Sequence, residues 1–74
     1  MSRFNTIIAG ASVANMASAE GGYNYYGYIR TNGEWIIMRE NTAQTEYRFA
    51  FGNADYSTNW TGRAGLDYKL PTVS

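Results

Sequence analysis

The sequence predicts a mainly β protein, a small antiparallel sheet of about four strands arranged as a meander, with an N-terminal arm or short helix. The first observation is Asn32-Gly33, which separates two runs of alternating apolar and polar residues and is the strongest short-range signal for a β-hairpin. The second is a further run of this kind at residues 46–51, and the third is another at residues 66–70. Together they predict strands at 23–30, 35–40, 46–51 and 66–70.

A two-residue turn at Asn32-Gly33 would set the register of the first hairpin and pair Tyr26 with Arg39. A four-residue loop at 42–45 would then pair Phe49 with Met38. This register predicts a core face made of Tyr25, Ile29, Ile36, Met38, Tyr47, Phe49 and Phe51. It predicts a second face made of Tyr26, Tyr28, Arg30, Trp35, Ile37, Arg39, Arg48 and Ala50, which is too aromatic for a solvated face and which we interpret as a contact face.

The other elements follow from local signals. Gly27 would lie opposite Met38, where its missing side chain makes room for a neighbouring ring or marks a bulge. Residues 52–55 have turn chemistry, and a cap at residue 57, 58 or 59 would begin one helical turn that brings Trp60 inward and ends before Gly65. Residues 66–70 would form an edge strand that ends at Pro71.

Composition divides the chain into an N-terminal arm at 1–22 and a small β domain at 23–74. Residues 1–19 are rich in Ala, Ser, Gly and Asn, and three interpretations remain open: a secretory signal with Arg3 as its charged residue, a short helix, or an extended arm that crosses onto an adjacent subunit. A fourth is that the segment covers the apolar face of its own sheet. The residues expected to anchor the arm are Phe4, Ile7, Ile8, Val13 and Met16.

The composition argues against an enzyme. The sequence has no cysteine and no histidine, which removes disulfides, thiolate metal ligands and the commonest general base. Glu40 and Glu46 flank one loop, but nothing in the sequence predicts that either is buried, and Lys69 is a poor candidate for a catalytic base. We therefore expect no catalytic residues, no metal and no cofactor.

The contact face predicts a binding function. Arg39 and Arg48 would lie opposite each other, which costs stability unless something compensates the two charges. Single-stranded nucleic acid stacked on the aromatic residues, cation–π pairs within the sheet, and carboxylates of a neighbouring subunit are the three candidates. We favour the neighbouring subunit because the net charge is zero, which argues against nucleic acid. The predicted sheet contacts are Tyr26, Tyr28, Arg30, Trp35, Arg39 and Arg48.

A resemblance agrees with this interpretation. At residues 28–30, 33–37 and 56–68 the chain resembles short proteins encoded among the structural genes of tailed bacteriophages. The resemblance implies a virion component, such as a capsid cement or decoration subunit or a tail or fibre accessory, and it carries over no functional residues. The expected partners are other protein subunits, either further copies or a major capsid or tail protein, with no membrane. The alternatives are a single-stranded nucleic-acid-binding module and a glycan-binding fibre accessory.

Overall fold

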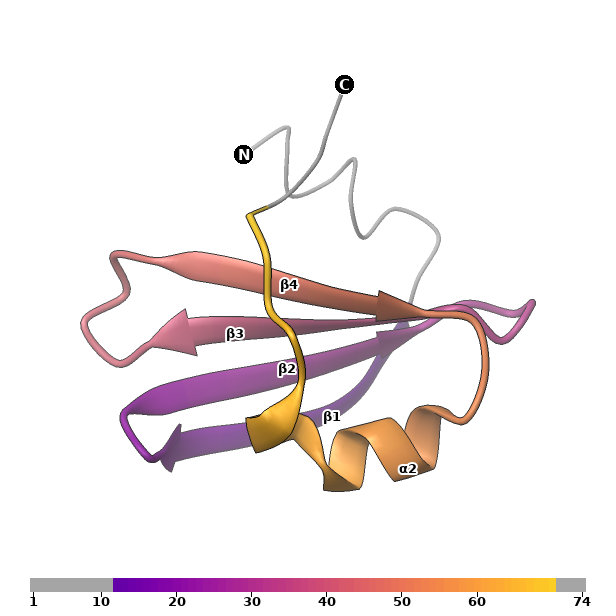
Figure 1. Cartoon of the computed structure of the whole chain (residues 1–74), viewed down its shortest axis with the longest axis horizontal. Coiled ribbons are helices and arrows are strands. Elements are labelled where there is room, and N and C mark those ends of the chain that lie inside the picture. The colour runs from indigo at the N-terminus through magenta and orange to yellow at the C-terminus, as the bar shows by residue number, and fades with distance from the viewer. Residues whose placement is uncertain (1–11, 71–74) are drawn as a thin grey trace.

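The computed structural model describes residues 12–70, which form one antiparallel sheet with strands in the order β1-β2-β3-β4 (Figure 1). The strands are β1 (Ser12–Glu20), β2 (Tyr23–Ile29), β3 (Trp35–Asn41) and β4 (Tyr47–Gly52). The predicted mainly β meander of four strands is therefore confirmed. Residues 1–11, with the predicted anchors Phe4, Ile7 and Ile8, lie outside the described residues, as do residues 71–74.

The strand that completes the sheet is β1, which the sequence analysis did not predict. Residues 12–20 are extended rather than helical and pair with β2 of their own chain, so the proposed boundary at 22/23 falls inside a hairpin. Its turn is made by Gly21 and Gly22, both at positive φ. Residues 66–70 contribute a single bridge instead of a strand: Phe49 N donates to Lys69 O at 2.7 Å, and Lys69 N donates to Phe49 O at 2.9 Å.

The predicted register between β2 and β3 is wrong by one residue. Arg30 N donates to Glu34 O, Gly33 N donates to Arg30 O, and Gly33 alone of the loop has positive φ, at 91°. This is a three-residue loop that ends in a left-handed glycine, not a two-residue turn. Tyr26 therefore lies opposite Met38. Between β3 and β4 the predicted register is confirmed, with Phe49 opposite Met38.

A slip of one residue moves every side chain of a strand to the other face, so the two predicted faces are mixed. Face A carries Val13, Met16, Asn24, Tyr26, Tyr28, Ile36, Met38, Glu40, Tyr47, Phe49 and Phe51. Face B carries Asn15, Ala17, Tyr23, Tyr25, Gly27, Ile29, Trp35, Ile37, Arg39, Arg48, Ala50 and Gly52. Each face has its own apolar cluster, centred on Phe49 for face A and on Ile37 for face B.

The residues after β4 fold onto face B. Helix α2 (Tyr56–Thr61) and the 3-10 helix η1 (Arg63–Gly65) lie over β1 and β2, and the following segment crosses β3 and β4 (Figure 1). The helix begins after Asp55, which has positive φ and provides no side-chain cap, so the predicted cap at residue 57, 58 or 59 is wrong. Trp60 does pack against the face B cluster, as expected.

Candidate protein-binding surface

Two of the predicted contact residues belong to the interior of face B. Trp35 is 5% exposed, and its Nε1 donates to Ala54 O at 2.7 Å. The guanidinium carbon of Arg39 lies 4.4 Å from the ring centroid of Tyr23 and 4.7 Å from that of Tyr68. These contacts match the cation–π interpretation, and they compensate the charge of Arg39 within the chain.

The other two arginines have polar contacts near in sequence. Arg48 lies opposite Arg39, as predicted, and its Nη1 donates to Tyr47 O at 3.0 Å. Arg30 Nη1 lies 3.2 Å from Glu34 Oε1 in an ion pair. The predicted set is therefore not brought together: Tyr26 and Tyr28 are on face A, whereas Trp35, Arg39 and Arg48 are on face B.

An ion pair that the sequence does not predict, between Arg63 and Glu20, joins the C-terminal layer to the sheet. Arg63 Nε and Nη2 donate to the two carboxylate oxygens of Glu20 at 2.9 and 2.8 Å, and Nη1 donates to Trp60 O at 2.8 Å. The hydrogen bond from Arg63 lowers the pKa of the Glu20 carboxyl. Glu20 and Arg63 are 43 residues apart, so no local pattern could have predicted the pair.

Face A presents a continuous apolar surface along β1 and β2, which we call the β1–β2 patch and define as Val13, Met16, Tyr26 and Tyr28. Val13 lies opposite Tyr28, and Met16 lies opposite Tyr26. Val13 is 61% exposed and Met16 is 64% exposed, whereas the two tyrosines are half-buried. Two of the predicted arm residues therefore do lie on an exposed apolar surface, together with two of the predicted sheet residues.

A buried carboxylate hydrogen-bonds to one tyrosine of this patch, Tyr26. Glu40 is 6% exposed, and its Oε1 accepts hydrogen bonds from Asn24 Nδ2 and from the Tyr26 hydroxyl, each at 3.0 Å. Burial, with a smaller contribution from Glu40, raises the pKa of both Tyr26 and Tyr28. The patch therefore carries no tyrosinate charge at neutral pH.

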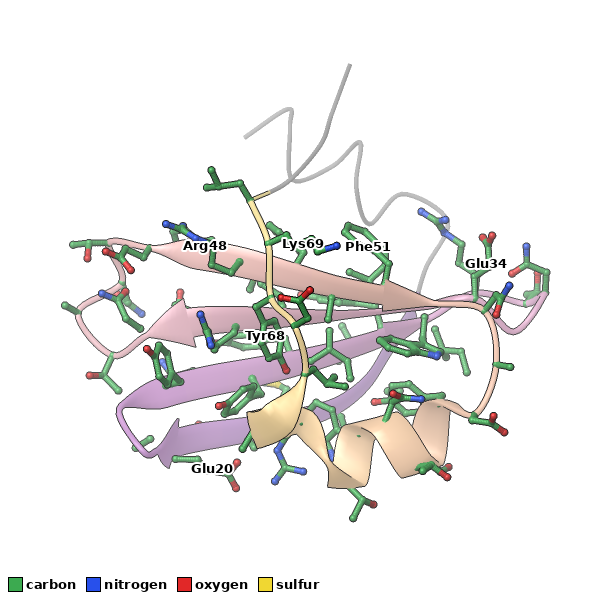
Figure 2. The ribbon with its side chains drawn as sticks, viewed as in Figure 1. Glu20, Glu34, Arg48, Phe51, Tyr68 and Lys69 are labelled. Atoms are coloured by element: carbon green, nitrogen blue, oxygen red, sulfur yellow. The ribbon has the colours of Figure 1, made fainter. Side chains whose placement is uncertain are left out.

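A cavity of about 350 Å³ lies near the β4 edge of the sheet, opposite the β1 edge, between β4 and the C-terminal segment. Its lining is Trp35, Phe49, Ala50, Phe51, Asn59, Leu66, Asp67 and Lys69. Figure 2 shows Phe51 and Lys69 beside β4, whereas Tyr68 lies over β3 and β2, where its ring contacts Arg39 and Tyr25. Among residues 12–70 no three His, Cys, Asp or Glu side chains are close enough together to hold a metal ion.

Comparison with known proteins adds no relatives. No protein-family model, no curated protein and no solved structure matches this chain. The resemblance to phage structural proteins therefore stays a prediction. None of the helices within residues 12–70 has the length and hydropathy that crossing a membrane requires.

Proposed function

We propose that this protein is a structural subunit of a virion, and that it docks onto other protein subunits through the β1–β2 patch. The observation that carries the proposal is the exposure of Val13 and Met16 beside two half-buried tyrosines. Apolar surface of this kind is stabilised when another protein covers it. Tyrosine and methionine are also enriched where proteins meet.

The charges support a protein partner over nucleic acid. The net charge is zero, and Arg39 and Arg63 lie against rings and Glu20 of their own chain. The predicted stacking platform for single-stranded bases is divided between the two faces, since Trp35 is buried on face B. The assignment to a virion depends on the resemblance of residues 28–30, 33–37 and 56–68 to phage proteins.

The test has two parts. Mass spectrometry of purified phage particles should recover this protein at a fixed stoichiometry to a major structural protein. In co-sedimentation with particles that lack it, Met16→Glu should weaken binding at least about tenfold, because a charge replaces a buried apolar contact.

The matched control is Thr58→Glu, which adds the same charge at an exposed position of α2. We expect it to bind like the wild type. Absence from the particles, or equal binding by both variants, would contradict the proposal.

The cavity beside β4 favours a second candidate, the glycan-binding fibre accessory. Its lining includes Phe51, which is 51% exposed, and the polar residues Asn59 and Asp67, a combination that suits a sugar ring with one apolar face and several hydroxyls. Titration with N-acetylglucosamine should then shift the indole N–H resonance of Trp35 and leave that of Trp60 unchanged. An unchanged Trp35 resonance would count against binding of this sugar.

A further inference from the structure

The two edge strands of the sheet, β1 and β4, differ in how far their outer backbone groups are covered. The outer edge of β4 is partly covered by the backbone of Lys69, which pairs with Phe49. The outer edge of β1 has no strand against it among residues 12–70. β1 is also the longest strand in the described part of the chain, with nine residues, and it contains no Lys, Arg or Pro. Proteins usually protect an edge with those residues, with β-bulges or by keeping the edge strand short, and the register shifts of β1 leave Asn15, Met16 and Ala17 as its regularly paired stretch.

The hydrogen-bond pattern shows which backbone groups β1 directs outward. Phe49 directs its backbone N–H and C=O toward Lys69. The backbone groups of the next residues in β4, Arg48 and Ala50, therefore point toward β3. The same alternation continues across the sheet. The backbone groups of Met38 and Tyr26 point toward each other, and so do those of Tyr25 and Ala17. Ala17 therefore bonds to β2, whereas the backbone groups of Met16 point away from the sheet. Met16 is therefore an edge residue whose N–H and C=O have no partner among residues 12–70 and whose side chain is exposed.

We propose that the β1 edges of two copies of this chain pair in antiparallel fashion around a two-fold axis near Met16, and so form one continuous sheet across the dimer. The register shifts between Val13 and Asn15 and between Ala17 and Glu20 flank the regular stretch of β1, which places the axis at its centre. The inference goes beyond the proposed docking, because it concerns the purified protein alone.

Charge favours a second copy as the occupant of this edge. A two-fold axis brings like residues opposite each other, which destabilises an edge that carries charges. Glu20 is the one charged residue of β1, lies at its end, and is neutralised by Arg63 of the same chain. Pairing would also join the Val13 and Met16 side chains of both copies into one apolar surface on face A.

The test is amide hydrogen exchange by NMR at low and high concentrations of the purified full chain, with its mass followed by sedimentation. The Met16 amide should be unprotected in the monomer and become protected as the dimer forms. The Ala17 amide, which bonds within the sheet, should be protected at both concentrations and serves as the internal control. A chain that stays monomeric, or a dimer whose Met16 amide remains unprotected, would overturn the inference.

Variants at the same residue separate pairing from folding. Met16→Pro removes the outward N–H and should weaken dimerisation at least about tenfold, while the Ala17 amide stays protected. Met16→Thr keeps the N–H and is the control for loss of the side chain, so it should weaken dimerisation less than Met16→Pro does. If Met16→Pro fails to fold, Met16→Lys replaces it, with Thr58→Lys as the control for added charge. Dimerisation of the folded Pro or Lys variant at wild-type affinity would refute the pairing, whatever the outcome of the particle-binding experiment.

Discussion

The hydroxyl of Tyr56 lies directly over Gly27, so that a Cβ at Gly27 would overlap it and would also lie 3.0 Å from Trp60 Cε3. The ring of Tyr56 stacks with that of Trp60, with centroids 6.2 Å apart, and its hydroxyl donates to Asn15 Oδ1 at 2.8 Å. The missing side chain of one strand residue is thus what allows α2 to approach β1 and β2. The expectation that Gly27 makes room for a ring is confirmed, although its partner in β3 is Ile37 and not Met38.

Gly27→Ala should therefore lower the free energy of unfolding by about 1–3 kcal/mol, the usual cost of placing an extra methyl group in a packed interior. Chemical denaturation measures this. Gly65→Ala is the matched control, because a Cβ there meets nothing within 4 Å and the residue has no positive φ. Equal stability of the two variants would mean that α2 does not pack on Gly27.

The Glu20–Arg63 pair predicts a loss of stability in acid. The hydrogen bond from Arg63 holds the folded-state pKa of Glu20 below the ordinary 4.5 of a glutamate, so the pair stabilises the fold above that pH and the contribution disappears as the pH falls. The Tm of Glu20→Gln should be lower than that of the wild type at pH 7, and the difference should vanish toward pH 3. Glu46→Gln, at an exposed position of the β3–β4 loop, should change little at either pH.

The half-buried side chain of Tyr68 predicts a loss of stability in alkali. Burial raises the pKa of Tyr68 above the ordinary 10.0 of a tyrosine, so its contribution to stability is complete below pH 10 and is lost as the pH rises further. Tyr68→Phe removes the hydrogen bond to Arg63 O, made at 2.8 Å, and should cost about 1 kcal/mol at pH 7. Its stability should nevertheless fall less steeply than that of the wild type between pH 10 and 12. A steeper fall in the variant would show that the hydroxyl ionises freely in the fold.

The side chain of Trp35 lies across Gly52, where a Cβ would fall 2.7 Å from Nε1 and nearer still to other ring atoms. Gly52→Ala should displace the indole, weaken its hydrogen bond to Ala54 and lower the free energy of unfolding by about 1–3 kcal/mol. Because Trp35 is buried, the change should also shift its fluorescence emission to longer wavelength. Trp60→Phe in both proteins isolates that signal, and an unshifted spectrum would contradict the packing.

Local turn chemistry predicted the register of one hairpin correctly and that of the other wrongly. The loop at 42–45 set the β3–β4 register correctly. At Asn32-Gly33 the same kind of argument chose the wrong loop length, because glycine suits both the two-residue turn and the three-residue loop that forms. This difference of one residue in loop length places Trp35 and Arg39 on the opposite face of the sheet from Tyr26 and Tyr28.

β1 was missed for a different reason. Its Ala, Ser and Asn residues have little strand propensity, and what holds them is pairing with β2 together with Asn15–Tyr56 and Glu20–Arg63 contacts from the far end of the chain. Val13 and Met16 were selected as partner-binding residues from their apolar character alone. Their place beside Tyr26 and Tyr28 could be seen only once β1 was paired.

Methionine oxidation tests the docking claim most directly. Met16 and Met38 lie on the same face, but Met16 is 64% exposed and Met38 is 5% exposed, so peroxide should oxidise Met16 much faster in the free monomer. In the assembled particle Met16 should be protected to nearly the level of Met38. Oxidation of Met16 at the same rate in the particle as in the free monomer would contradict docking through the β1–β2 patch.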